Sequence, residues 1–394
     1  MSIIIAILIF ALIILIHELG HFSAARLFKM RVYEFNMGMG PTILKKRGKE
    51  TDYNIKLIPF GGSCKLGEDD SYDISESEEE IVANLMRVDD EFLRNNPDYK
   101  ALSKGAKLRL DPNAFRNKPV WQRMIVILAG AFLNLVLGLI ICIIMVSMQN
   151  LVGTTTIHSF NPDVETLSDQ TLREGDIVVS VNGMAIFTTA DIRYQLANSE
   201  SKLTDDANKA VFEFVVIRDG QRIVFENVEF RAQTNENGGK QIENELIWIG
   251  EPKDFFNVIA GGAKEMVSYS RLIIVTLIDI FKGTYGLNDF AGPVGVVNVI
   301  DEVSSAGFAE SFAAGIRMSL FMAALITVNV GIFNLLPIPA LDGARFIFFV
   351  VEAIRRKPLK AEVEGLIHFI GFAALMLLML VITFNDIRKL IFGE

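Results

Sequence analysis

The chain has 394 residues, of which 51% are hydrophobic and only 22% are charged, and its mean hydropathy is +0.36. This composition is too apolar for an ordinary soluble enzyme and is typical of a membrane protein with an attached soluble part. The formal net charge is −9, and twelve of the acidic residues lie between residues 68 and 98, so nucleic acid is not an expected partner. The two cysteines, Cys64 and Cys142, imply neither a disulfide framework nor a zinc-ligand spacing.

Four apolar segments have the length expected of a helix that spans a bilayer. They are residues 3–28, 124–148, 312–336 and 366–384. The first could be mistaken for a secretory signal peptide, but no basic residue precedes it and no small-residue cleavage site follows it. We therefore expect this segment to remain in the mature protein.

The distribution of lysine and arginine predicts the orientation of these segments. Basic residues cluster after the first segment, before the second and between the last two, whereas none occurs in residues 147–172 or 283–316. Because basic flanks favour the cytoplasmic side, the region between the second and third segments is expected to be extracytoplasmic. Both termini are then expected outside as well.

The cytoplasmic stretch between the first two segments has two parts of different character. Residues 52–66 include an apolar/polar alternation bounded by Pro59 and Gly61-Gly62, which predicts a strand that enters a turn. Residues 68–112 are polar and acidic, and they are expected to form a solvated insert that is partly helical around residues 78–93.

The extracytoplasmic part begins with a region rich in predicted strands, residues 151–232. The run 177–183 ends in an Asn-Gly turn signal, and residues 211–230 are typical of a hairpin about Asp219-Gly220. This region is long enough for one small domain. Residues 255–281 then predict a helix that carries too many charges for a confident span, and we expect it to lie at the outer membrane surface or to pack on the domain.

The strongest chemical signal is the sequence H-E-x-x-H, formed by His17, Glu18 and His21 at the end of the first apolar segment. At about 100° per residue, positions i and i+4 lie on nearly the same helix face, so both imidazoles can bind one zinc ion. The glutamate then stands where it can take a proton from the attacking water and pass it to the leaving amine.

Such a short motif can also arise by chance. Its position argues against chance, because a carboxylate at membrane depth costs on the order of 3 kcal/mol on insertion scales and two histidines add to that cost. Groups of this kind rarely persist in a span without a function, so we favour the metal site.

A catalytic zinc ion usually has three protein ligands, so a third one must come from elsewhere in the chain. Asp342 is the candidate, because two prolines in the segment 334–343 break the helix near the cytoplasmic end of the third span and place it on the same side as His21. The alternative for an isolated Asp-Gly pair is a helix N-cap or a turn residue.

The HELGH sequence together with NLLPIPALDG (334–343) resembles the site-2 protease family, specifically the bacterial branch that releases membrane-held regulators such as anti-sigma factors. The resemblance extends over most of the chain. Further matching segments are FNMGMGP (35–41), IPFGG (58–62), KPVWQRMIVILAGAFLN (118–134), LREGDIVVSVNG (172–183, resembling the core of a PDZ domain) and GPVG (292–295).

This resemblance implies roles for individual residues. His17, His21 and Asp342 would be zinc ligands, and Glu18 would be the general base. Asn334 would contact the substrate, and the region around Pro59, Gly61 and Gly62 would belong to a membrane-associated β-loop that holds the substrate as a strand. A helical peptide bond must be unwound before water can reach its carbonyl, and a strand edge offers replacement hydrogen bonds. We expect that edge to include Ile55 and Leu57.

The expected fold is a polytopic α-helical membrane protein with about four transmembrane helices, a membrane-associated β-loop and one small extracytoplasmic PDZ-like β-rich domain. The expected function is that of a Zn2+-dependent intramembrane metalloprotease in a bacterial inner membrane, with its active site toward the cytoplasm. Its partners would be the lipid bilayer and single-span membrane proteins that another protease has already trimmed. The expected segments are 1–30 (first helix), 31–67 (β-loop), 68–118 (acidic insert), 119–150 (second helix), 151–232 (PDZ-like domain), 233–311 (linker and surface helix), 312–345 (third helix) and 346–394 (loop and fourth helix).

Two other functions fit parts of the sequence. A non-catalytic membrane scaffold could hold partners through the PDZ-like domain, but it would be expected to lose Glu18 or Asp342. A metal-binding or transport protein would be expected to carry ionisable residues on several spans, whereas outside the zinc set they are few and lie near the span ends.

Overall fold

The computed structural model describes residues 2–48, 51–66, 113–197, 208–234, 240–283 and 292–392. The chain divides into two compact units, and we describe each by itself. One consists of Met1–Gly138 and Tyr285–Glu394, and the other of Leu139–Thr284. The predicted acidic insert, residues 68–112, lies outside the described residues.

The four apolar segments are helices: α1 (Ser2–Leu27), α5 (Val120–Met148), α9 (Phe312–Leu335) and α11 (Ala361–Phe392). Within the described part of the chain, these four are long and apolar enough to cross a membrane. The predicted segments are therefore confirmed as helices. Helices α5 and α11 both begin before the apolar segments themselves, because polar residues join their first turns without breaking the helical hydrogen bonds, and α5 lies within the predicted helix 119–150.

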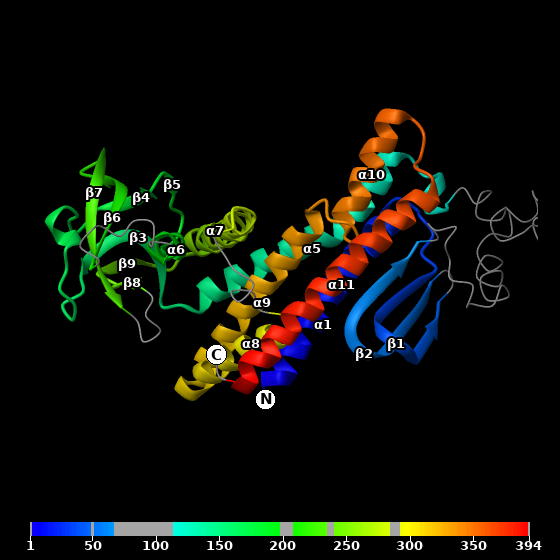
Figure 1. Ribbon diagram of the computed structural model, residues 1–394, viewed down its shortest axis with the longest axis horizontal. Coiled ribbons are helices and arrows are strands. Elements are labelled where there is room, and N and C mark those ends of the chain that lie inside the picture. Colours follow the sequence, from blue (N-terminus) through cyan, green and yellow to red (C-terminus); the bar gives the residue numbers. More distant parts are fainter. Residues whose placement is uncertain are drawn as a thin grey trace, which may run out of the picture. The chain divides into compact units, whose positions relative to one another are not determined.

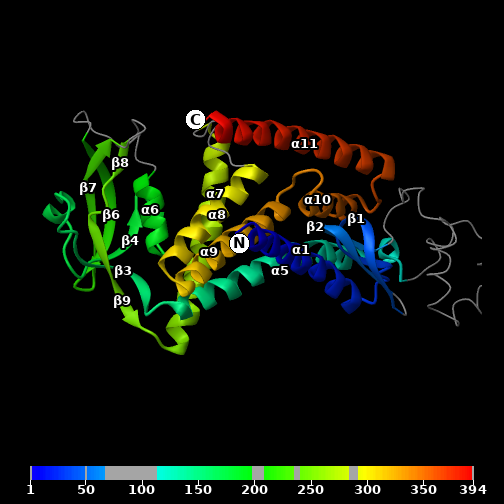
Figure 2. The ribbon, with the colours of Figure 1, turned by 90° about the horizontal axis from the view of Figure 1, so that it is seen from below.

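Small residues let α1, α5 and α9 lie side by side in the first unit (Figures 1 and 2). A Cβ atom on Gly20 of α1 would come within 2.3 Å of the Ala129 carbonyl oxygen of α5, and one on Gly331 of α9 within 2.9 Å of Leu135. Membrane helices associate through this kind of close backbone approach, because lipid gives them no hydrophobic reason to associate. The packing brings the H-E-x-x-H turn of α1 directly against α5.

Two long strands, β1 (Glu34–Arg47) and β2 (Asp52–Lys65), form the predicted β-loop. Each strand folds back, and the register gives four arms in the order 61–65, 34–39, 52–58 and 42–47. Phe35, for example, pairs with Cys64 on one side and with Tyr53 on the other. The free edges are therefore the arms 61–65 and 42–47.

This arrangement corrects one sequence expectation. Ile55 pairs with Met37 on one side and with Leu44 on the other, so it lies inside the sheet and not on an edge. The alternating pattern of residues 52–58 predicted a strand correctly, but alternation reports which face a side chain occupies and not which neighbours its backbone has.

A buried amide fixes three of the four arms of the β-loop. Asn36, which is completely buried, donates a hydrogen bond from Nδ2 to Ser63 Oγ (2.9 Å) and accepts one at Oδ1 from Asn54 Nδ2 (2.7 Å). Buried polar groups that satisfy one another in this way hold a single arrangement. The 61–65 arm is thereby fixed relative to its neighbours.

The first unit contains two further helices that the sequence reading assigned to a linker and to a loop. They are α8 (Pro293–Glu310) and α10 (Asp342–Arg355). The Arg123 guanidinium, near the start of α5, makes two hydrogen bonds of 2.5 and 3.2 Å to the carboxylate of Glu352 on α10. This charge-assisted pair holds α10 against α5.

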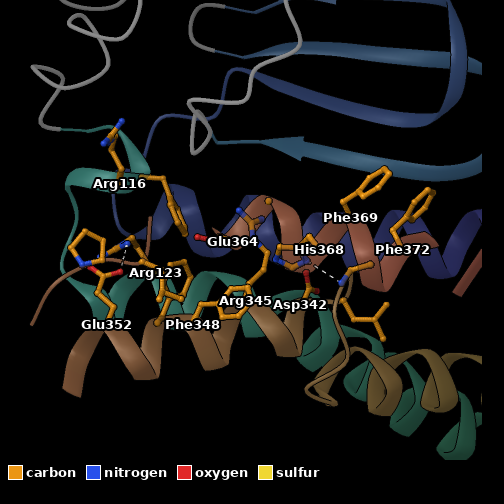
Figure 3. Close-up of a pocket in the computed structure, with 17 residues that line it drawn as sticks. Arg116, Arg123, Asp342, Arg345, Phe348, Glu352, Glu364, His368, Phe369 and Phe372 are labelled. Atoms are coloured by element: carbon orange, nitrogen blue, oxygen red, sulfur yellow. Dashed lines mark hydrogen bonds and ion pairs between the residues drawn. The ribbon is translucent and has the colours of Figure 1, made fainter. Parts of the chain in front are cut away.

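A cavity of about 610 Å³ lies between α10 and α11, and Asp342 is one of its lining residues (Figure 3). Charged side chains of both signs line it together with aromatic rings, among them Arg345 and Phe348 of α10 and Glu364 of α11. Burial lowers the pKa of the Arg345 guanidinium below its usual range, and the Glu364 carboxylate opposes that shift. The cavity gives Asp342 a polar surrounding on its α10–α11 side.

The second unit is built on an antiparallel sheet with the strand order β8-β7-β6-β4-β3-β9, and β5 (Met184–Ala185) pairs with β4. Its other strands are β3 (Leu151–Phe160), β4 (Ile177–Val181), β6 (Lys209–Arg218), β7 (Gln221–Thr234), β8 (Lys240–Ile242) and β9 (Leu246–Pro252). The hairpin about Asp219-Gly220 is confirmed, and both residues have positive φ. Phe212, Phe214 and Phe230 pack at the centre of its core.

The sheet continues beyond residue 232, where the sequence reading ended the domain. Strand β9 pairs with β3 from Leu151↔Pro252 to Phe160↔Leu246. The sheet therefore includes residues up to 252. The first and last residues of the sheet, Leu151 and Pro252, are direct neighbours.

Helix α7 (Phe255–Phe281) has the predicted bounds and packs on this sheet domain through α6 (Thr189–Ala197). The contact is polar and buried: Ser268 of α7 donates to Asp191, and Thr188 donates to Ser268 (3.0 Å). The Arg271 guanidinium lies 2.6 Å from the Asp191 carboxylate, which is fully buried. Packing on the domain, one of the two expected positions of this helix, is confirmed.

Candidate metal centre

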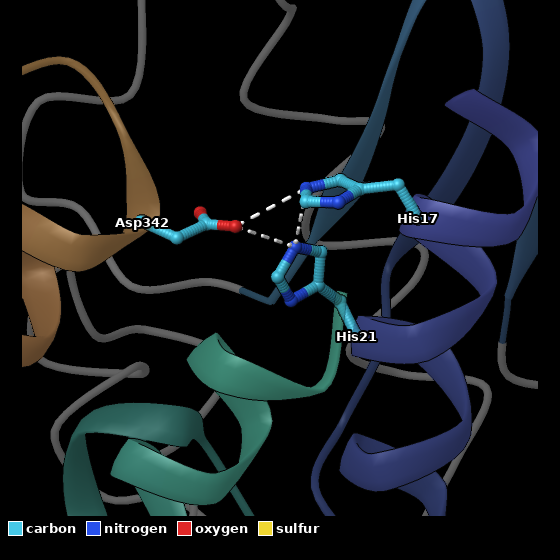
Figure 4. A group of neighbouring side chains, drawn as sticks. All are labelled: His17, His21 and Asp342. Atoms are coloured by element: carbon cyan, nitrogen blue, oxygen red, sulfur yellow. Dashed lines mark hydrogen bonds and ion pairs between the residues drawn. The ribbon is translucent and has the colours of Figure 1, made fainter. Parts of the chain in front are cut away.

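Three side chains converge at the end of α1 and the beginning of α10 (Figure 4). Asp342 Oδ2 lies 3.1 Å from His17 Nε2 and 3.3 Å from His21 Nε2, and the two Nε2 atoms are 3.2 Å apart. One ligand atom from each residue lies within 4.8 Å of the other two. Helix geometry brings the histidines together, since residues i and i+4 share a face. The set is the one that the sequence predicted as a metal site.

A break between two helices carries Asp342 to this position. Helix α9 ends at Leu335, Pro337 and Pro339 follow, and α10 starts at Asp342 itself. The chain folds back so closely that a Cβ atom on Gly343 would come within 2.1 Å of the Leu336 carbonyl oxygen. The two prolines thus act as predicted, and the glycine of the Asp-Gly pair is required by close backbone contact.

The surroundings of His21 leave its Nε2 atom available for a metal ion. Its Nδ1 atom lies 2.8 Å from the Val126 carbonyl oxygen of α5. A carbonyl oxygen can only accept a hydrogen bond, so Nδ1 carries the proton and the lone pair is on Nε2. An imidazole held through its second nitrogen is the usual arrangement of a metal ligand.

Asn134 of α5 can do the same for His17. It is completely buried, and its carboxamide lies 3.3 Å from His17 Nδ1. With the amide nitrogen toward the ring, Asn134 Oδ1 has no hydrogen-bond partner among the described atoms. The Asn134 carboxamide has the same shape when its oxygen and nitrogen are exchanged. In that orientation Asn134 Oδ1 accepts a hydrogen bond from His17 Nδ1–H, and the lone pair of His17 Nε2 is available for a metal ion. The donor set, with each imidazole held through its Nδ1 atom, therefore fits a metal ion.

Gly130 of α5 makes room for the two imidazoles. A Cβ atom at this position would come within 2.5 Å of His21 Nε2 and 2.8 Å of His17 Cε1. Sequence reasoning matched the run 118–134 to the site-2 protease family but assigned no role to Gly130 or Asn134. The available signal was Asn134 itself, an amide in the middle of an otherwise apolar segment.

Glu18 lies beside the β-loop. It lines a cavity of about 100 Å³ together with Asn36, Gly61 and Gly62. A Cβ atom on Gly62 would come within 2.7 Å of Glu18 Cγ, so the 61–65 arm passes directly over the glutamate.

The other predicted substrate contacts are placed less closely. Pro59 lies within β2, two residues before Gly61. Asn334 is half-buried in the last turn of α9 and lines neither of the two cavities described above. The structure thus brings Glu18, Gly61 and Gly62 together around one cavity, and Asn334 does not line that cavity.

Comparison with known proteins gives one family and several full-length relatives. Residues 5–378 match the model of Peptidase family M50. "Regulator of sigma-W protease RasP" of Bacillus subtilis is 29% identical over 429 residues, covering 98% of this chain and 97% of that protein. "Zinc metalloprotease RasP" of Geobacillus kaustophilus is 30% identical over 435 residues (98% of each), and "Probable protease eep" of Enterococcus faecalis is 28% identical over 442 residues (99% and 100%).

The fold and the site define a membrane-embedded metallopeptidase, with an H-E-x-x-H helix and a distant aspartate meeting among candidate spans. The chain belongs to Peptidase family M50, and it is a zinc metalloprotease of the site-2 protease type. The resemblance recognised in the sequence is thereby confirmed. Neither the scaffold nor the transport alternative accounts for the complete set of residues.

Gly130→Ala is expected to lower zinc content and activity together, because its methyl group would occupy the space of both imidazoles. Zinc analysis of the purified variant measures the effect, and retention below about one half of the wild-type content is expected since overpacking displaces side chains by tenths of an ångström or more. Gly153→Ala is the control, because a Cβ atom there meets nothing within 4 Å. Full zinc content and activity in Gly130→Ala would contradict the assigned role.

Proposed function

We propose that this protease hydrolyses peptide bonds within transmembrane segments of other membrane proteins, with His17, His21 and Asp342 as zinc ligands and Glu18 as general base. The observation that carries this proposal is the convergence of three ligand atoms from the apolar helix α1 and from the start of α10, with Glu18 next to His17 in the sequence of α1. A hydrolytic centre on a helix that spans the bilayer would act on peptide segments that also lie in the bilayer.

A zinc ion held by His17, His21 and Asp342 would supply Lewis-acid catalysis for attack on the peptide carbonyl. Glu18 takes a proton from the attacking water, whose oxygen bonds to the carbonyl carbon. The same carboxyl group then gives the proton to the nitrogen of the breaking C–N bond, so that a carboxylic acid and an amine leave. The Val126 carbonyl and the Asn134 carboxamide hold the two imidazoles in fixed orientation during these steps.

We propose that the 61–65 arm of β2 holds the substrate. This arm has a free edge, lies over Glu18 and is fixed by the Asn36 amide. A substrate segment that leaves its helix can exchange its internal hydrogen bonds for bonds to this edge. Pro59, Gly61 and Gly62 would shape the bend that begins the arm, and Asn334 would contact the substrate at the end of α9.

The substrates would be single-span membrane proteins, such as anti-sigma factors or signal-peptide remnants, that another protease has trimmed first. The name of the Bacillus subtilis relative, a regulator of sigma-W, supports the first of these classes. The distribution of lysine and arginine supports a bacterial inner membrane with the metal centre toward the cytoplasm. The sheet of residues 151–252 would be an extracytoplasmic PDZ-like domain that excludes untrimmed substrates.

Glu18→Gln is expected to reduce cleavage of a co-expressed single-span regulator by at least about 100-fold, because a positioned general base contributes that much or more. It should keep about one zinc ion per chain, whereas Asp342→Ala should lose most of its zinc because one of three protein ligands is gone. Released cytoplasmic fragment and zinc content are measured on the same preparations. Wild-type cleavage by Glu18→Gln would overturn the proposed chemistry, and full zinc in Asp342→Ala would move the third ligand elsewhere.

Gly62→Ala is expected to impair cleavage at least about tenfold while zinc content stays at the wild-type level. The added methyl group would meet Glu18 Cγ and Ile14 Cγ2 and would push the 61–65 arm away from the catalytic glutamate, a displacement of the kind that costs large factors in rate. Cleavage rate and zinc content are compared with those of Gly153→Ala. An active Gly62→Ala enzyme would show that the arm does not present the substrate.

Removal of the sheet domain is expected to admit untrimmed substrates. Because Leu151 and Pro252 are paired neighbours about 5 Å apart, residues 152–251 can be replaced by a short Gly/Ser linker without stretching the chain. The shortened enzyme should cleave a pre-trimmed substrate at a rate near that of the intact enzyme and should also cleave the untrimmed one. Continued rejection of the untrimmed substrate by an otherwise active deletion enzyme would place the size filter in another segment.

A further inference from the structure

The turn that delivers Asp342 to the metal centre contains a strained residue. Ala340 has φ of +78°, a left-handed conformation that is strained for an alanine and persists only where the surroundings impose it. It lies two residues before Asp342, between Pro339 and the start of α10. Whatever holds Ala340 in this conformation also sets the position from which the Asp342 carboxylate extends.

Two residues of α11 contact this turn. The Ala340 backbone N–H donates a hydrogen bond to His368 Nδ1 (3.0 Å), which must therefore be the unprotonated nitrogen of the ring. Gly371 approaches so closely that a Cβ atom there would come within 2.1 Å of Pro339 Cβ. Residues 368 and 371 are three apart and share one face of the helix.

The His368 ring is also fixed from α10. Its centroid lies 5.4 Å from that of Phe348, and the two rings meet edge to face at 83°. Figure 3 shows His368 on α11 facing the segment that carries Asp342. The imidazole therefore touches both the turn before Asp342 and the helix that follows it. No other role in the proposed chemistry uses this histidine.

We propose that His368 is a positioning residue that holds the Ala340 turn, and through it the Asp342 carboxylate, in the geometry of the zinc site, with Gly371 allowing the close approach. This inference rests on the proposed ligand role of Asp342. In this role His368 acts through the backbone of the turn, where it accepts the Ala340 N–H hydrogen bond.

Two substitutions separate the hydrogen bond from the packing. His368→Asn keeps an acceptor at the same number of bonds from the backbone as Nδ1 but loses the ring, whereas His368→Phe keeps the ring against Phe348 but loses the acceptor. His368→Phe should release zinc to a chelator about fivefold faster than wild type, which is the size of effect expected from one net hydrogen bond. Its kcat should fall by a similar factor with KM nearly unchanged, because the substrate edge is on β2.

His368→Asn should recover most of both losses. Gly371→Ala should resemble His368→Phe, and Gly365→Ala on the same helix is its matched control because a Cβ atom there meets nothing within 4 Å. Wild-type zinc release and kcat in His368→Phe, or a defect in His368→Asn that His368→Phe does not share, would overturn the inference.

The Asp342→Ala variant distinguishes this inference from the proposed function on which it rests. If Asp342→Ala keeps its zinc, the ligand assignment fails and His368 has nothing to position. If Asp342→Ala loses zinc while His368→Phe keeps wild-type zinc release and kcat, only the positioning role fails. Because His368 acts through Asp342, the double variant Asp342→Ala/His368→Phe should lose no more zinc than Asp342→Ala alone.

Discussion

Ionisable groups among apolar helices are the constraint on which the rest of this site depends. Two imidazoles and two carboxylates lie on α1 or next to it, among apolar helices, where each group costs free energy unless a partner satisfies it. A metal ion that accepts three of these groups as ligands turns that cost into binding. The second nitrogen of each imidazole is met by the protein itself, at the Val126 carbonyl and the Asn134 carboxamide.

The same constraint explains why irregular backbone occurs where it does. Peptide groups outside helices need hydrogen-bond partners at membrane depth, and they are tolerated where protein surrounds them. In the β-loop, the arms pair with one another and the Asn36 amide joins three of them. In the break between α9 and α10, the N–H of Ala340 is satisfied by His368. Both irregular segments lie next to the metal centre, so the chemistry and the departures from helix occur in the same place.

The sequence predicted those features that depend on local patterns. Apolar length predicted α1, α5, α9 and α11, the Asp219-Gly220 pair between two strand patterns predicted the hairpin, and helical periodicity placed His17 and His21 on one face. Even Asp342 followed from local chemistry, because two prolines stop a helix wherever it is packed.

Features that depend on which segments become neighbours could not be predicted in the same way. Gly130 and Asn134 have their roles only because α5 lies against the H-E-x-x-H turn, and a glycine within an apolar helix has several ordinary explanations. Ile55 was placed on an edge because alternation gives no information about the arm 42–47 that covers it. Strand β9 follows a polar stretch and was missed, since its pairing with β3 spans almost the whole domain.

The residues of the metal centre are consequently held in place in two different ways. Helix α1 supplies His17, Glu18 and His21 with the fixed spacing of about one helical turn, and this spacing survives any rigid movement of the helix. Asp342 has no such protection, because its position relative to α1 depends on the turn after α9, where two prolines remove backbone donors and Ala340 is strained. A strained turn has a lower-energy conformation available, so it needs contacts from outside its own segment to keep the carboxylate within bonding distance of the histidines. Helix α11 provides those contacts through the side chain of His368 and through Gly371, whose lack of a side chain allows the close approach to Pro339. Residues more than 20 positions beyond Asp342 therefore affect the geometry of a site that the local motifs alone would place on α1 and α10.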